Sequence, residues 1–567
     1  MTRLAWSLPR LGEGRSTSER LGTGLLVGAA LLLCVFLILP LGVLLIGSVF
    51  DEAGELSLVR FAEFASTPGM GRAVWNTIWV AVVVTVLTVP LAFLYAYAIQ
   101  RACLPLRGVW RIIGLSALLG PSLVGAISFI QWFGTQGVLK SWLGEHSVYG
   151  PIGIILSTVY ASFPHALMIL VVALATADAR LFEAAEALSA SRWRKFVTVT
   201  LPSARYGLIS AALVVFSYSV SEFGIPKVIG GNFPVLAVEV YVQVVGMHNF
   251  GRGAVVALLL LFPVLLAFLV DWRIQRKQQA SLTARAVPYV PRPDWRRDLP
   301  LLAYCVLVSV AMLGVLGMAA YTSLVKFWPY NLELSLDHYR YGLAEAGVLA
   351  AYLNSLKIAS LTALVGTPFI FLVAYLVEKN RSGPAWLRPL VQGAAALPMG
   401  VPGLVLGFGY ILFFNHPSNP LNGLYHTLAI MVIANVVHYY TSCHLTALTS
   451  LKSIDREFEA VSASLKVSQF VTLWRVTLPV CLPAVLEIAR YLFINAMTTV
   501  SALVFLYSPE TLPASVSILN LDEAGELGPA AAMATLIVLT CALVSLLYSL
   551  LTHFLFRRQQ AWRNPNR

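Results

Sequence analysis

The chain has 567 residues, of which 58% are hydrophobic and only 12% are charged. Soluble globular proteins carry about 25% charged residues, so this composition excludes an ordinary soluble domain and indicates a membrane protein with several spans. The formal net charge of +12 raises the question of nucleic-acid binding, which the distribution of the basic residues answers below.

Runs of about 20 apolar residues can cross a bilayer as helices, because lipid offers no partner for an open backbone. The first run follows a polar, basic N-terminal segment and is too long for the apolar core of a signal peptide, so we expect it to be retained as a transmembrane helix. The sequence predicts an all-α membrane protein with about twelve transmembrane helices, near 22–49, 75–98, 112–134, 152–175, 206–224, 253–271, 299–321, 353–377, 391–414, 425–447, 484–506 and 529–553.

The basic residues predict the orientation of these helices. With the N-terminus in the cytoplasm, the inner segments hold 30 of the 39 Lys and Arg residues, and the outer segments with their margins hold eight. Loops rich in Lys and Arg stay on the cytoplasmic side, which predicts that both termini are cytoplasmic. Orientation thus explains the basic excess, and we expect membrane lipid, but no nucleic acid, as a partner.

The second half of the chain repeats the first. Segment 75–99 resembles segment 352–377, and three matched pairs share one common spacing: Asn76 and Asn354, Pro90 and Pro368, and Tyr97 and Tyr375. Because each half has six predicted spans, an even number, the second copy enters the membrane in the same orientation as the first, as a parallel repeat. We expect a first repeat at 1–271, a basic cytoplasmic linker with extended character at 272–298 and a second repeat at 299–567.

A charged, alanine-rich segment at 178–205 separates the fourth and fifth predicted spans. Its composition predicts a short helix at 182–188, with Asp178 as the N-cap, and Pro202 is expected to begin the next span. One apolar stripe follows the helix, and its members are Leu181, Ala185 and Leu188. The stripe has no core of its own, so it must bury against the spans, a partner or the lipid surface.

A similar segment recurs at 454–482, between the tenth and eleventh predicted spans, and its Pro479 corresponds to Pro202. A single helix of this kind is as compatible with lying on lipid as with binding a partner. Two helices at equivalent places, both facing the cytoplasm, favour a paired docking surface.

The first segment, EAAEALSASRWRKFVTVTLP, resembles the EAA motif of permease subunits in binding-protein-dependent ABC importers. The residues that match are Glu183, Ala184, Ala185, Ser189, Leu201 and Pro202. In the second segment the corresponding residues are Glu459, Ala460, Leu465, Leu478 and Pro479. With both copies in one chain, the resemblance extends over nearly the whole sequence and is to fused permeases of the iron(III), thiamine and 2-aminoethylphosphonate type.

The resemblance implies the type I ABC importer permease fold, in which the EAA helices couple the spans to cytoplasmic ATPases. It implies as partners a homodimeric ABC ATPase, which hydrolyses the ATP, and a periplasmic or lipid-tethered substrate-binding protein. It also implies a place in the bacterial inner membrane. The chain itself is expected to hold no cofactor and to be no enzyme, since it lacks a GxxxxGK[ST] loop.

Two departures from the motif concern the turn and the register. Ser189 and Lys466 stand where the family has glycine, and a positive φ costs such residues on the order of 1 kcal/mol or more, so the turn is expected to differ in shape. Glu459 stands one position further from its Leu-Pro pair than Glu183 does from Leu201-Pro202. The second glutamate is therefore out of register.

The outer loops 221–253 and 505–528 are punctuated by Gly, Pro and Asn, so we expect them to fold compactly where a binding protein would dock. They look most like the loops of 2-aminoethylphosphonate permeases, which implies a small polar or anionic substrate. An iron(III) or thiamine importer is the alternative, and so is a stand-alone secondary transporter of twelve helices.

Polar residues inside apolar spans are functional candidates. The candidates for the substrate pathway or its gate are Glu222, Lys227, Asn435, His438 and Asn495, although Lys227 is also compatible with a solvated surface. Glu487 and Arg490, at i and i+3, are expected to pair with each other. No nucleophile with a neighbouring base stands out, so we expect no catalytic residues.

The histidines and cysteines lack the spacing of metal ligands, so we expect no metal site. The six cysteines are single and are interpreted as small buried hydrophobes; they are Cys34, Cys103, Cys305, Cys443, Cys481 and Cys541.

Overall fold

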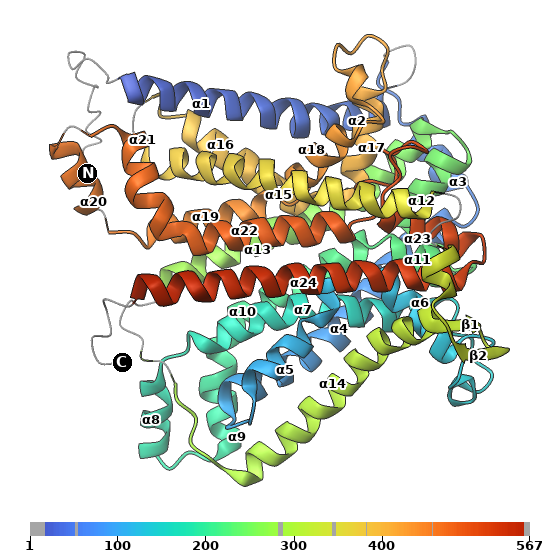
Figure 1. The fold of residues 1–567 in the computed structure, drawn as a ribbon, viewed down its shortest axis with the longest axis horizontal. Helices are drawn as coiled ribbons and strands as arrows, with labels where there is room; N and C mark the ends of the chain where they lie inside the picture. The colour runs from blue at the N-terminus through green and yellow to red at the C-terminus, as the bar shows by residue number, and fades with distance from the viewer. Residues whose placement is uncertain are drawn as a thin grey trace.

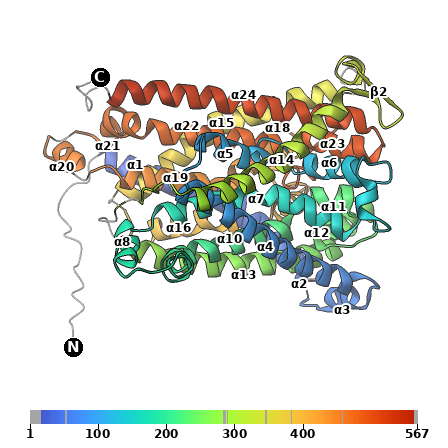
Figure 2. The same ribbon diagram turned by 90° about the horizontal axis from the view of Figure 1, so that it is seen from below.

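The computed structural model describes residues 17–50, 55–281, 287, 289–342, 347–380, 383–455, 457–465 and 467–560. Within these ranges long helices lie side by side, and the loops gather at the two ends of the bundle (Figures 1 and 2). The sheet structure described is a two-stranded hairpin, β1 (Val325–Phe327) and β2 (Asn331–Leu334). The expected all-α membrane fold is confirmed.

Nine helical segments of the described chain are long and apolar enough to cross a membrane. Several join helices without a break, so their bounds are given by element. They are α1 (Thr17–Leu33) with η1 (Cys34–Ile38) and α2 (Leu39–Val49), α4 (Met70–Arg101), α7 (Pro151–Ala175), α9 (Arg192–Lys195) with η4 (Phe196–Thr200) and α10 (Leu201–Ser221), α13 (Phe250–Ser281), α14 (Trp295–Leu324), α15 (Val348–Lys379), α21 (Gln469–Thr472) with η9 (Leu473–Thr477) and α22 (Leu478–Thr498), and α24 (Leu527–Gln560).

Three predicted spans are broken, so the prediction of twelve continuous helices is wrong. The third consists of α5 (Arg107–Gly114), η2 (Ser116–Leu119) and α6 (Leu123–Phe133). The ninth bends by 112° and the tenth by 54°; their parts are α16 (Leu387–Ala396), η7 (Leu397–Gly400) and α17 (Gly403–Phe414), then α18 (Leu428–His438) and α19 (Tyr440–Lys452). Counting both bent pairs as spans gives eleven in the described chain.

Prolines explain two of these breaks. Gly120 and Val401 each precede a proline and have an extended backbone, because proline disfavours the helical conformation of the residue before it and has no N–H to continue the ladder. Both breaks lie in apolar sequence, which is why hydropathy predicts continuous spans there.

Short elements cover both ends of the bundle (Figure 1). At the predicted outer end the loops fold compactly, as expected, into α3 (Val59–Ser66), η3 (Lys140–Leu143), α11 (Gly224–Ile229), α12 (Leu236–Tyr241), η5 (Val242–Gly246), η6 (His338–Gly342), η8 (Asn422–Leu424) and α23 (Ala514–Glu523). The predicted cytoplasmic end carries α8 (Ala179–Ala187) and α20 (Glu457–Ser464).

The two halves make the same hydrogen bonds between a long helix and an outer loop. In each half an asparagine amide donates to a carbonyl, and the hydroxyl of the next residue accepts from a backbone N–H. The bonds are Asn76 to Pro234 (2.9 Å) and Leu236 to Thr77 (2.9 Å), then Asn354 to Leu512 (3.3 Å) and Ala514 to Ser355 (2.7 Å). All four residues of the second set follow their counterparts at the spacing that separates Asn76 from Asn354, which confirms the repeat.

The repeats also exchange their first helices. α1 and α2 pack against α16 and α17 of the second half, whereas α14 packs against α4, α5 and α6 of the first half; Figure 1 shows them on opposite sides of the bundle. The Tyr95 hydroxyl reaches the Ser309 hydroxyl at 3.0 Å, and Ser128 donates to the Val315 carbonyl at 2.7 Å. Neither repeat is therefore a closed packing unit by itself.

Candidate functional site

The helix α8 begins at the predicted N-cap: Asp178 Oδ1 accepts from the Arg180 N–H at 3.1 Å. Its buried residues are Ala179, Phe182 and Ala185. The predicted apolar stripe is wrong in part, because Leu181 and Leu188 point outward, and the Leu188 side chain is 82% exposed. Phe182 takes the inward place because it meets a partner from a distant part of the chain.

That partner is Arg101, the last residue of α4, whose side chain is only 3% exposed. Its guanidinium carbon lies 4.5 Å from the ring centroids of both Phe182 and Tyr289, and a guanidinium N–H donates to the Leu174 carbonyl at 2.9 Å. A cation over aromatic faces is stabilised by the ring quadrupoles. Arg101 was not predicted; its signal in the sequence was that the repeat aligns it with Lys379, the last residue of the equivalent helix.

Tyr289 belongs to the predicted linker, which lies along α8. The Ala179 N–H donates to the Val287 carbonyl at 2.9 Å, and the Val287 N–H reaches Asp178 Oδ1 at 3.4 Å. Further along, Asp294 forms an ion pair with Arg192 of α9 at 2.6 Å. α13 continues to Ser281, so the first part of the predicted linker is helical and its later part follows the surface of α8 and α9.

The turn after α8 uses Ser189 in the left-handed conformation, with φ of +53°. The Ser189 N–H donates to the Glu186 carbonyl and the Ala190 N–H to the Ala185 carbonyl, both at 2.9 Å. These two bonds form the Schellman ending, which normally places glycine at this position. The expectation that Ser189 would change the turn is therefore wrong, since the serine adopts the glycine conformation.

The helix α20 ends with the same type of bond, from the Val467 N–H to the Ser462 carbonyl at 2.9 Å; Lys466 lies outside the described residues. Lys379 of α15 forms an ion pair with Glu459. The spacing that relates Ala185 to Ser462, the carbonyls of the two helix endings, also relates Phe182 to Glu459. Glu459 is thus the counterpart of Phe182 and not of Glu183, which confirms that it is out of register.

The remaining motif residues lie at the surface of this end. Exposed residues on the two short helices and their turns are Glu183, Ala184, Ser189, Ala460 and Leu465. Leu201 and Leu478 begin α10 and α22, each followed by a proline as predicted. Pro202, Pro479 and Leu201 are exposed, and Leu478 is half-buried.

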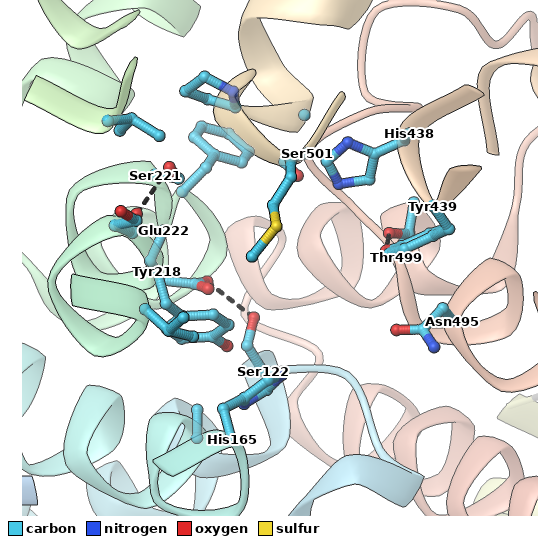
Figure 3. Close-up of a pocket in the computed structure, with 18 of the residues that line it drawn as sticks. Ser122, His165, Tyr218, Ser221, Glu222, His438, Tyr439, Asn495, Thr499 and Ser501 are labelled. Carbon is cyan, nitrogen blue, oxygen red and sulfur yellow. Dashed lines mark hydrogen bonds between the residues drawn. The ribbon is translucent and has the colours of Figure 1, made fainter. Parts of the chain in front are cut away.

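A cavity of about 330 Å³ lies between the two repeats. Figure 3 shows Ser122, His165, Tyr218 and Glu222 on one side and His438, Tyr439, Asn495 and Thr499 on the other. Glu222 Oε1 accepts from the Ser122 hydroxyl at 2.7 Å and from the Ile225 N–H at 3.2 Å. The spacing of Pro202 and Pro479 also relates Tyr218 to Asn495 and Glu222 to Thr499. Equivalent positions of the two repeats therefore face one space.

Three of the five predicted pathway residues, Glu222, His438 and Asn495, line this cavity. Asn435 does not line it and is fully buried in α18. Asp271 and the tyrosines that line the cavity were not predicted, because they lie on long helices where a single polar residue gives little signal.

Lys227 lies at the predicted outer end and not in the cavity. Its Nζ pairs with Glu523 Oε1 of α23 at 2.7 Å and sits 5.1 Å from the Tyr241 ring centroid. Burial, with the Glu523 charge beside it, raises the pKa of Asp522 to about 6. The structure therefore places Lys227 as a tie between loops of the two repeats.

Other expectations concern pairs and metals. Arg490 and Glu487 form the expected ion pair. Of the cysteines, Cys34 and Cys103 are only half-buried, whereas the other four are buried as expected. Within the ranges that the structure describes, no three His, Cys, Asp or Glu side chains gather closely enough to hold a metal ion.

A family model described as "Binding-protein-dependent transport system inner membrane component" matches residues 104–279 and 366–557, one segment in each repeat. The chain is 27% identical over 545 residues to the "Ferric transport system permease protein FbpB" of Actinobacillus pleuropneumoniae, which covers 93% of this chain and 77% of the relative. It is 23% identical over 271 residues to the "Sulfate transport system permease protein CysW" of Escherichia coli K12, which covers 46% of this chain and 91% of the relative.

Among solved structures, a chain of a bacterial ABC transporter involved in alginate import matches with a TM-score of 0.39 and 19% identity, over 46% of this chain and 97% of that chain. None of the relatives named here is described as a 2-aminoethylphosphonate permease, so they give no support to the predicted phosphonate substrate.

Proposed function

Because the chain belongs to the family of binding-protein-dependent transport system inner membrane components, we propose that it is the membrane subunit of an ATP-driven importer with both permease repeats in one chain. The repeats comprise residues 1–271 and 299–567, and the linker at 272–298 lies on the cytoplasmic side of a bacterial inner membrane with both termini. ATP is hydrolysed by a partner and not by this chain.

The observation that carries this proposal is a pair of matched apolar residues on the two short helices. Leu181 and Leu188 of α8 are exposed, and so are their aligned counterparts on α20 and its turn, Phe458 and Leu465. Large apolar side chains repeated on an exposed surface mark an interaction site. Two equivalent sites at one end of the molecule (Figure 1) fit a homodimeric ATPase, whose two subunits present the same surface twice.

The opposite end supports a second partner. The loops α11, α12 and α23 gather there and are tied across the repeats by Lys227 and Glu523. A substrate-binding protein that docks there would contact both repeats at once.

We propose iron(III) as the substrate in preference to 2-aminoethylphosphonate. A relative named as a ferric permease aligns with 93% of the chain, whereas the sulfate permease aligns with 46%. Thiamine has no comparable support.

The experiment replaces Leu188 and Leu465 together by glutamate. The double variant Leu188→Glu/Leu465→Glu is expected to lose most ATPase co-purification and most uptake of radiolabelled iron(III), since two charges enter an apolar contact. Leu336→Glu, at an exposed leucine of the outer end, is the matched control and keeps both. Normal ATPase binding and uptake in the double variant would contradict the proposal, and so would transport by the purified chain alone on an ion gradient.

A further inference from the structure

The cavity between the repeats carries charge of one sign. Its charged lining residues are Glu222 and Asp271, and none of the described residues that line it is Lys or Arg. Carboxylates buried without a cation are costly, because water that would stabilise their charge is displaced. The cavity therefore favours a positively charged occupant and disfavours an anion.

Asp271 is the more exacting of the two groups. Its side chain is 3% exposed; Oδ2 accepts from the Gln275 amide at 2.6 Å, but Oδ1 has no hydrogen-bond partner among the described residues. Buried polar atoms are nearly always paired in native proteins. A carboxylate oxygen without a partner inside a cavity marks a place for a cation.

Glu222 is held in position for the same task. The Ser122 hydroxyl and the Ile225 N–H both donate to Oε1, which fixes the direction of the carboxylate. Around it the cavity offers the oxygens of Tyr218, Tyr439 and Asn495 (Figure 3). Carboxylate and other oxygen ligands suit hard metal ions, whereas cysteine thiolates, which suit soft ones, are absent from the described lining.

The two carboxylates lie at different depths. Glu222 follows directly on the outer end of α10, whereas Asp271 lies far along α13 from its outer end at Phe250, a distance of about 30 Å at about 1.5 Å per residue. We propose that the cavity is a transit site for a hard metal cation, which passes from Glu222 toward Asp271 and the cytoplasm without its anionic carriers. This inference rests on the proposed importer function and restricts its substrate class to cations.

The test uses terbium(III), a hard trivalent ion whose luminescence is excited through nearby tyrosines, on the purified complex with its ATPase. Tyr218, Tyr439 and Tyr491 line the cavity, so the bound ion reports directly on this site. Glu222→Gln keeps the size and the acceptor oxygen of the side chain, and Asp271→Asn does likewise. Each is expected to weaken terbium binding by about tenfold or more, equivalent to about 1.4 kcal/mol, and to lower iron(III) uptake in proteoliposomes.

The matched controls separate charge from structure. Glu333→Gln, at an exposed carboxylate of the hairpin, leaves terbium binding and uptake unchanged. The exchange Glu222→Thr/Thr499→Glu moves the carboxylate to the equivalent position of the other repeat and restores most of the binding that Glu222→Thr loses.

Unchanged terbium binding in both Glu222→Gln and Asp271→Asn would overturn the inference, as would uptake of sulfate or a phosphonate by the wild-type complex at a rate equal to that of iron(III). The importer proposal would survive either result, because it fails only if no ATPase binds α8 and α20.

Discussion

The two short cytoplasmic helices share a backbone ending but are attached to the spans by different chemistry. α8 is attached through Arg101, which lies over the rings of Phe182 and Tyr289. α20 is attached through the ion pair of Lys379 with Glu459. Both cations end the equivalent long helix, so the place of the contact is common to the repeats whereas the kind of contact is not.

The difference has an energetic consequence. The Arg101 contact is buried and also includes a hydrogen bond to a carbonyl, whereas the Glu459 side chain is 37% exposed. Partly exposed ion pairs typically contribute about 0–1 kcal/mol. We therefore expect α8 to be the firmly held helix and α20 the more loosely held one.

The largest expected effect comes from Arg101→Ala. A desolvated cation over aromatic rings contributes about 2 kcal/mol and a hydrogen bond from a charged group about 1.5–3 kcal/mol, so we expect α8 to lose roughly 3 kcal/mol of local stability. Amide hydrogen exchange of α8 measures this loss. Lys379→Ala is the matched variant and is expected to cost α20 at most about 1 kcal/mol; equal losses in the two helices would refute the comparison.

Removing the linker's share should have a smaller effect, confined to the first helix. Tyr289→Ala takes away one of the two rings under Arg101 and a ring contact with Phe182 at 4.7 Å between centroids, so we expect α8 to lose about 1–2 kcal/mol. Hydrogen exchange is again the measure. Tyr289→Phe keeps the ring and should match the wild type, and any loosening of α20 in Tyr289→Ala would contradict a role limited to α8.

Local signals in the sequence were sufficient for part of this arrangement. Asp178 was predicted as an N-cap because capping depends only on near neighbours in the chain. The repeat was visible because Asn76 and Asn354 make the same hydrogen bond in each half.

Contacts between distant residues could not be predicted in the same way. Leu181 was assigned inward and Phe182 was not, because helical spacing alone does not reveal that the end of α4 and the linker between the repeats both reach α8. The breaks at Pro121 and Pro402 lie in apolar runs, so hydropathy predicts continuous spans there. The two carboxylates of the cavity belong to helices whose facing is set only when the repeats pack.

A third effect concerns the turn of the first helix. Ser189 has a positive φ of 53°, which glycine adopts without the steric cost that other residues incur, so Ser189→Gly is expected to stabilise the end of α8 by about 1 kcal/mol. Ser191→Ala should act in the opposite direction by about 1 kcal/mol, because the Ser191 hydroxyl accepts from the Arg194 N–H at 3.2 Å as the N-cap of α9. Hydrogen exchange at the end of α8 and in α9 measures both changes. Loss of protection in Ser189→Gly would show that the serine hydroxyl, and not the backbone, maintains the turn.

The smallest effect is also the most selective, because it separates the two attachments without any substitution. Salt screens charges over about 10 Å at 0.1 M and over about 3 Å at 1 M, and it acts most strongly on charges that water reaches. Raising the NaCl concentration over this range should lower the protection of α20 by about 0.5 kcal/mol and leave that of α8 unchanged, since Arg101 is buried and its partners are uncharged rings. Lys379→Ala should abolish the salt response of α20. A response of equal size in α8 would mean that the Arg192–Asp294 ion pair, and not Arg101, holds the first helix.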